Sequence, residues 1–85
     1  MDRPDWWSWD LAYTEHVEGR MLERGLSDVG LRTMLEDATS LIQRGRQGRW
    51  TVQTRYEDRP WVVVVEPDWD ERLLYVVTVY PKDRP

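Results

Sequence analysis

The chain of 85 residues is the size of one domain and carries a net charge of −4 at pH 7. It has no cysteine, which excludes a disulfide-bonded scaffold, a thiol nucleophile and a thiolate metal site. Its longest apolar run, Trp61 to Val65, is far shorter than the roughly 20 residues of a membrane helix. We therefore expect a cytoplasmic protein that makes no membrane contact and does not act by non-specific phosphate binding alone.

Residues 1–13 form an acidic arm that is rich in tryptophan, with Trp6, Trp7 and Trp9 close together. One interpretation is that these indoles pack over the edge of a sheet or over the first helix. The other is a docking segment for a partner, because exposed tryptophan is favoured at the energetic centres of interfaces. We expect Asp10 to Tyr13 to form a short edge strand that leads into the first helix.

The next segment has the signals of a helix at both of its ends. Thr14 is a suitable N-cap, because its hydroxyl can accept a free amide N–H of the first turn. Val17, Met21 and Leu22 recur at helical spacing and predict an apolar stripe. Gly25 is typical of the left-handed residue that ends a helix. The pattern predicts a helix between Thr14 and Gly25.

A second helix is predicted directly afterwards, with Ser27 as its N-cap and Asp28 in its first turn. Gly30 weakens this helix by up to about 1 kcal/mol relative to alanine. The connection is so short that the two helices should form a tight hairpin or corner. The residues predicted to form the buried stripe are Leu31, Met34, Leu35 and Ala38.

From Ser40 onward the apolar pattern alternates with a period of two, which is typical of strands. Leu41 and Ile42 predict a short strand, and residues 50–56 predict a strand with one wet face. The β-branched run at 61–66 predicts a central strand buried on both faces, and 73–80 is a second such run. Short connections between successive strands favour antiparallel pairing.

These elements predict an α+β domain in which two N-terminal helices pack on an antiparallel sheet of three to four strands. We place the arm at residues 1–13, the domain at 14–81 and a short tail at 82–85.

Three basic side chains stack on one face of the first predicted helix. His16, Arg20 and Arg24 stand at positions i, i+4 and i+8. An imidazole and two guanidinium groups on one ridge can hold an anion or serve acid–base chemistry. They can equally be solvated, or pair with carboxylates such as those of Glu23 and Asp28. One histidine, no cysteine and carboxylates without ligand-like spacing argue against a metal site, and we expect no cofactor.

Four short segments resemble a known family: His16-Val17, Arg20-Met21, the run E-R-G-L-S at 23–27, and V-T-V-Y at 77–80. They are similar to the BrnT-like group called domain of unknown function 4258, within the RelE/ParE toxin superfamily. The resemblance covers about Thr14 to Pro81. It implies a RelE/ParE-like fold and a type II toxin that a cognate antitoxin protein holds inactive. Toxins of this superfamily cleave mRNA, often on the ribosome, or act on other targets.

If the chain cleaves RNA without a metal, the ridge supplies the groups that such chemistry needs. His16 is suited to be the base or the acid, because an imidazole titrates near neutral pH. Arg20 and Arg24 would stabilise the phosphate, and Tyr80 would provide a second proton-transfer group or stack on a base. We expect Arg46, Arg49 and Arg55 to contact the RNA.

An alternative of a different class is a non-catalytic interaction module on the same fold. In that hypothesis, the negative charge and the tryptophan-rich arm bind a basic protein partner and not RNA. Under the same alternative, His16 is a local hydrogen-bond partner at the helix start, Arg20 and Arg24 are solvated or structural arginines, and Tyr80 belongs to the core.

Overall fold

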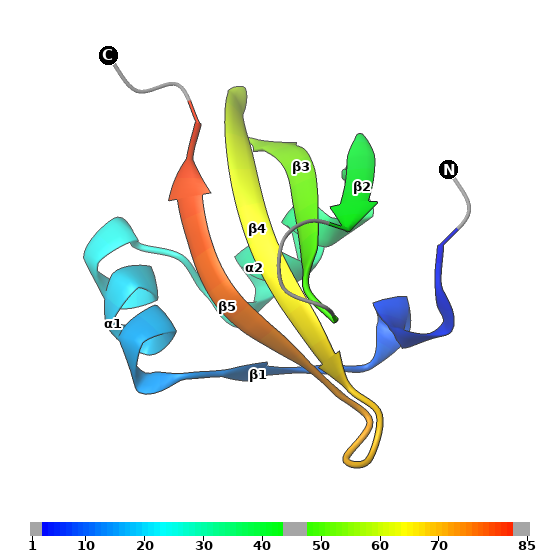
Figure 1. The fold of residues 1–85 in the computed structure, drawn as a ribbon. Helices are drawn as coiled ribbons and strands as arrows, with labels where there is room; N and C mark the ends of the chain where they lie inside the picture. Colours follow the sequence, from blue (N-terminus) through cyan, green and yellow to red (C-terminus); the bar gives the residue numbers. More distant parts are fainter. Residues whose placement is uncertain (1–2, 44–47, 83–85) are drawn as a thin grey trace.

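The fold of the chain was obtained as a computed structural model that describes residues 3–43 and 48–82. A short 3₁₀ helix, η1, precedes a strand, two α-helices and four further strands (Figure 1). Their bounds are η1 Asp5–Ser8, β1 Asp10–Tyr13, α1 Glu15–Arg24, α2 Asp28–Glu36, β2 Ser40–Gln43, β3 Trp50–Tyr56, β4 Arg59–Asp68 and β5 Leu73–Pro81.

The sheet has five strands in the order β1-β5-β4-β3-β2, so the prediction of three to four antiparallel strands is wrong in number and in pairing. Strands β2 to β5 form the expected antiparallel meander. Strand β1 is the predicted edge strand, but it pairs in parallel with β5, from Asp10↔Leu73 to Tyr13↔Val76. Short connections predict antiparallel pairing only for strands that are adjacent in sequence. They predict nothing about β1 and β5, which are separated by both helices.

The helix ends are those that the sequence predicted. The hydroxyl of Thr14 accepts a hydrogen bond from the Val17 amide at 3.2 Å. The hydroxyl of Ser27 likewise accepts one from the Gly30 amide at 3.1 Å. Gly25 ends α1 in the left-handed conformation, with φ of 69°. These contacts satisfy amide groups that the first turn of a helix leaves unpaired, and they fix where each helix begins.

Leu22 is the exception in the predicted apolar stripe of α1. Val17 and Met21 are buried, but the side chain of Leu22 is 83% exposed. At 100° per residue, Leu22 lies more than a quarter turn away from the direction between Val17 and Met21 that faces the sheet. The prediction that it is buried is therefore wrong. In α2 the stripe is confirmed, because Leu31, Met34 and Leu35 are fully buried and Ala38 packs beside the core.

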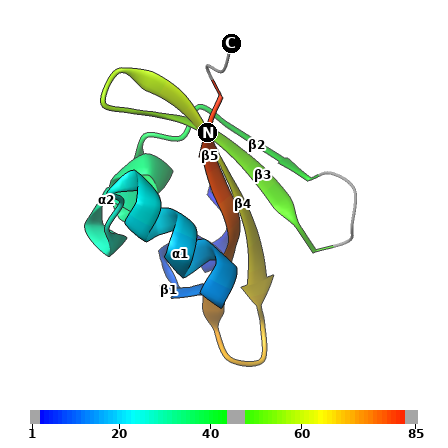
Figure 2. The same cartoon turned by 90° about the vertical axis from the view of Figure 1, so that its left-hand side faces the viewer.

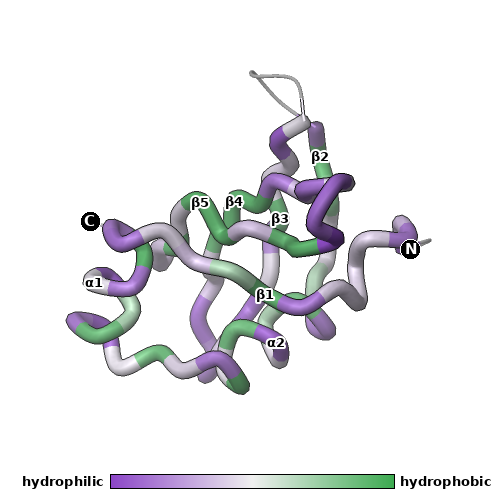
Figure 3. Tube along the Cα trace, turned by 90° about the horizontal axis from the view of Figure 1, so that it is seen from below, coloured by the Kyte–Doolittle hydropathy of each residue, from purple (hydrophilic) through white to green (hydrophobic). Residues whose placement is uncertain are grey.

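Both helices lie on one side of the sheet, and the core fills the space between the two layers (Figure 2). Hydrophobic stretches of β4 and β5 stand out when the chain is coloured by hydropathy (Figure 3). Trp61, Val63 and Val65 of β4 face this core. Val62 points to the other side, yet it is only 4% exposed, beside its cross-strand neighbour Tyr80. Strand β4 is therefore buried on both faces near its centre, as predicted.

The tryptophan-rich arm belongs to this core. Trp6 and Trp7 of η1 are buried, and Trp6 packs against Trp50 with tilted rings and 5.8 Å between ring centroids. Trp9 is partly buried and meets Trp69 edge-on at 4.9 Å. The interpretation of Trp6 and Trp7 as an exposed docking segment is thus wrong, because both indoles are buried in the core. None of the helices in residues 3–43 and 48–82 has the length and apolarity needed to cross a membrane.

Candidate functional site

The predicted basic ridge of α1 lies beside an unpaired edge of β5. Strand β1 pairs with β5 only as far as Val76, so the following residues have no strand on that side. Arg24 uses this edge: its Nη1 donates a hydrogen bond to the backbone carbonyl of Val79 at 3.2 Å. The contact joins the end of α1 to the sheet and satisfies an edge carbonyl, which protects the strand from pairing with another chain.

His16 and Arg20, the other two members of the ridge, are exposed. Within the described ranges, neither side chain has a hydrogen-bond or ion-pair partner. The alternative pairing with Glu23 or Asp28 is absent there too, since the Asp28 carboxylate accepts its hydrogen bond from the hydroxyl of Tyr13. Two cationic or titratable groups are therefore available to an external ligand.

Tyr80 follows Val79 directly, so the carbonyl bound by Arg24 and the tyrosine belong to adjacent residues of β5. Neighbouring residues of a strand point to opposite faces. Because Val79 is buried in the core, Tyr80 projects from the other face of the sheet, where it is 37% exposed. The structure thus brings Arg24 close to the strand that carries Tyr80, with the phenol on the face that the helices leave open.

The three arginines predicted to contact RNA are in different situations. The Nε of Arg49 is 2.9 Å from Oε1 of Glu66, in a partly exposed ion pair. The Nη2 of Arg55 donates to the backbone carbonyl of Asp58 at 3.0 Å, within the turn between β3 and β4. Arg46 lies outside the described residues. Arg49 and Arg55 already have partners, so they are less available to phosphates than His16 and Arg20.

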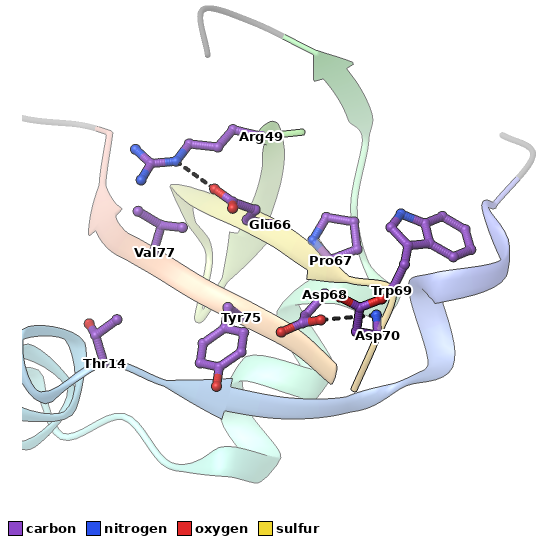
Figure 4. Close-up of a pocket in the computed structure, with 9 residues that line it drawn as sticks. All are labelled: Thr14, Arg49, Glu66, Pro67, Asp68, Trp69, Asp70, Tyr75 and Val77. Carbon is purple, nitrogen blue, oxygen red and sulfur yellow. Dashed lines mark hydrogen bonds and ion pairs between the residues drawn. The ribbon is translucent and has the colours of Figure 1, made fainter. Parts of the chain in front are cut away.

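The Arg49–Glu66 pair borders a hollow of about 610 Å³ on the open side of the sheet (Figure 4). Asp68 stabilises the turn beside it, because its Oδ1 accepts the amides of Asp70 and Glu71 at 3.0 and 3.1 Å. The lining contains three carboxylates and one guanidinium, so the hollow favours cations over phosphates. The residues lining it are Thr14, Arg49, Glu66, Pro67, Asp68, Trp69, Asp70, Tyr75 and Val77.

This hollow was not predicted, because its residues come from four separate segments of the chain. The strand register brings these residues together, because it sets Trp50 opposite Val65 and Tyr75 opposite Glu66. No group of three or more His, Cys, Asp or Glu side chains suited to a metal ion occurs in the part of the chain described.

A strand, two capped helices and an antiparallel meander, with the last strand returning beside the first, define a small α+β domain. The chain belongs to the family described as domain of unknown function DUF4258, whose family model matches residues 13–81. Comparison with curated proteins and with solved structures gave no match.

Proposed function

We propose that this protein is the toxin of a type II toxin–antitoxin pair, with a BrnT-like domain of the RelE/ParE superfamily. Its activity in this proposal is metal-independent cleavage of RNA. The residues that resemble the BrnT-like group occupy α1, the connection to α2 and the end of β5, which are also the elements that form the ridge. Membership of the DUF4258 family is consistent with that resemblance.

The observation that carries the proposal is the placement of the ridge. Arg24 is held against the β5 edge, and it leaves His16 and Arg20 exposed on the same flank of α1. A phosphate bound by Arg20 would therefore lie beside an imidazole, next to the strand that presents Tyr80. The guanidinium group suits this role because it stays protonated and binds phosphate oxygens in a bidentate manner.

The chemistry assigned to these groups is transesterification within RNA. His16 takes the proton of a 2′-hydroxyl, whose oxygen attacks the neighbouring phosphorus. Arg20 stabilises the negative charge that develops on the phosphate oxygens. The bond from phosphorus to the 5′-oxygen breaks, and the leaving oxygen takes a proton from water. Tyr80, on the opposite face of the sheet, would stack on a neighbouring base of the RNA. The products are a 2′,3′-cyclic phosphate and a free 5′-hydroxyl.

The test compares RNA cleavage and bacterial growth arrest for the wild type and a His16→Gln/Arg20→Gln variant. Both side chains are exposed and without partners in the described structure, so the variant should melt at the wild-type temperature. Because acid–base catalysis contributes about 10²–10⁴-fold, we expect cleavage to fall by at least about 100-fold. Arg72→Gln, in the exposed turn before β5, loses one positive charge elsewhere and should cleave normally. Equal cleavage by the wild type and the double variant, or none by the wild type, would refute the proposal.

A further inference from the structure

The net negative charge of the protein is accounted for by its helical side. Residues 10–37, which comprise β1, α1 and α2 with their connections, contain seven acidic and three basic side chains. This segment therefore holds a net −4, which equals the charge of the whole chain. The remaining residues, 1–9 and 38–85, contain nine acidic and nine basic side chains. A partner of the helical side therefore experiences an acidic surface.

Helix α1 divides into two flanks with different chemistry. Its spacing places Glu15, Glu18 and Leu22 together on the side opposite the basic ridge, and all three are exposed. The same side meets the start of α2, where the carboxylate of Asp28 binds the hydroxyl of Tyr13. We call this surface the acidic flank: Tyr13, Glu15, Glu18, Met21, Leu22, Leu26, Asp28 and Val29.

The acidic flank contains an apolar hollow of about 250 Å³, lined by Tyr13, Glu18, Met21, Leu22, Leu26, Ser27 and Asp28. Met21 and Leu26 form its base, each with only 8% of its surface exposed. The Leu26 amide donates to the Met21 carbonyl at 2.8 Å, a bond that holds the chain in place after Gly25. The base is therefore built into the helix corner, and it can receive an apolar side chain without rearrangement.

Two strongly exposed apolar side chains belong to the acidic flank, and Leu22 is the one that lines this hollow. Leu22 of α1 is 83% exposed and Val29 of α2 is 75% exposed, the two highest values among large hydrophobic residues of the described part. Asp28 lines both this hollow and a neighbouring one of about 580 Å³ that Val29 borders. The two hollows, one lined by Leu22 and the other by Val29, therefore share the Asp28 side chain.

From this geometry we propose that the acidic flank is a docking surface for a basic amphipathic helix of a partner protein. Apolar side chains of that helix, at i, i+3, i+4 and i+7, would cover Leu22, Val29 and the hollow. Its lysine and arginine side chains would face Glu15, Glu18 and Asp28. A second copy of this chain would set acidic flank against acidic flank, so like charges disfavour self-association there, and the same charge repels RNA.

The docking surface and the RNA surface lie on opposite flanks of α1. The docking proposal therefore does not depend on RNA cleavage, and the two can fail separately. A partner bound to the acidic flank would still lie close to the ridge, since both are carried by one ten-residue helix.

The experiment measures binding of a labelled 18-residue model helix that carries leucine on one face and lysine on the other. Its matched control has glutamate in place of every lysine. Titrations use fluorescence anisotropy, and backbone amide shifts of the isotope-labelled full chain locate the contact. We expect shifts in β1, α1 and α2, affinity that falls as salt is raised, and no binding of the glutamate peptide.

Leu22→Ser/Val29→Ser should weaken binding of the lysine peptide by at least about tenfold, as truncation at the centre of an interface does. Both side chains are exposed, so this variant should fold normally and retain RNA cleavage. Trp69→Ser removes an exposed apolar side chain between β4 and β5 that contacts Trp9 and does not belong to the acidic flank. It is the control and should bind as the wild type does. Equal binding by the double variant, shifts confined to strands β2 to β5, or a dimer that the double variant abolishes would overturn the proposal.

Discussion

Replacement of Gly30 by alanine tests how closely α2 packs on the sheet. A Cβ built on Gly30 would lie 2.9 Å from the hydroxyl oxygen of Tyr56 and 3.4 Å from its Cζ. The ring of Tyr56 is partly buried and meets Trp61 edge-on, with 6.3 Å between centroids, so it has little room to move. Gly30, which lowers the helix propensity of α2, is therefore the residue that allows Tyr56 of β3 to approach that helix.

The expected magnitude follows from two opposing effects. Alanine gains up to about 1 kcal/mol over glycine in helix propensity. Forcing an additional carbon into a packed contact costs about 1–3 kcal/mol. Gly19→Ala in α1 is the matched control, because a Cβ at Gly19 would have nothing within 4 Å and only the propensity gain applies. We expect Gly19→Ala to stabilise the domain and Gly30→Ala to be neutral or destabilising.

Thermal unfolding followed by circular dichroism measures the difference. At about 4–8 °C per kcal/mol for a domain of this size, the melting temperatures of the two variants should differ by at least about 4 °C. In a Tyr56→Phe background the hydroxyl is gone, so the penalty of Gly30→Ala should shrink. If Gly30→Ala raises the melting temperature as much as Gly19→Ala does, the close contact with Tyr56 does not constrain α2, and the reasoning fails.

Two further variants test contacts that join the helices to the sheet. Burial, followed by the hydrogen bond to Asp28, raises the pKa of the Tyr13 hydroxyl above its ordinary value. A group whose pKa is higher in the folded than in the unfolded state contributes stability below its unfolded pKa, about pH 10 for tyrosine, and this contribution is lost as the pH rises further. In urea unfolding, the difference in unfolding free energy between the wild type and Tyr13→Phe should therefore shrink above about pH 10. The buried Thr54 hydroxyl donates to the Met34 carbonyl at 2.5 Å, and Thr54→Val should cost about 1–3 kcal/mol in the same assay. Thr39→Val, which removes an exposed hydroxyl bonded to the Gln53 carbonyl at 3.2 Å, should change stability by no more than about 0.5 kcal/mol, and a cost equal to that of Thr54→Val would contradict this reasoning.

The placement of His16 and Arg20 on one exposed ridge could be predicted from spacing alone, because helical periodicity fixes which residues share a face. The segments that pack beside that ridge could not be predicted in this way. The contact between Arg24 and the Val79 carbonyl joins residues 55 positions apart, and it exists because β1 leaves the end of β5 unpaired. The availability of the site to a ligand is therefore a property of the sheet edge and not of the helix sequence.

The local features of this protein follow from short stretches of its sequence. Thr14, Ser27 and Gly25 define the helix ends through contacts within four residues of each, which are independent of the rest of the fold. Alternating apolar residues likewise specify β3, and continuous β-branched runs specify β4 and β5.

Which distant segments meet is settled by the packing of the whole domain. The parallel pairing of β1 with β5, the burial of Trp6 in the core and the ion pair of Arg49 with Glu66 all depend on the register and the layering. Such contacts become favourable once the two layers have packed, because each alone does not repay the entropy of closing a long loop. The sequence pattern contains no local signal for them, and the candidate site at the β5 edge is built from contacts of this kind.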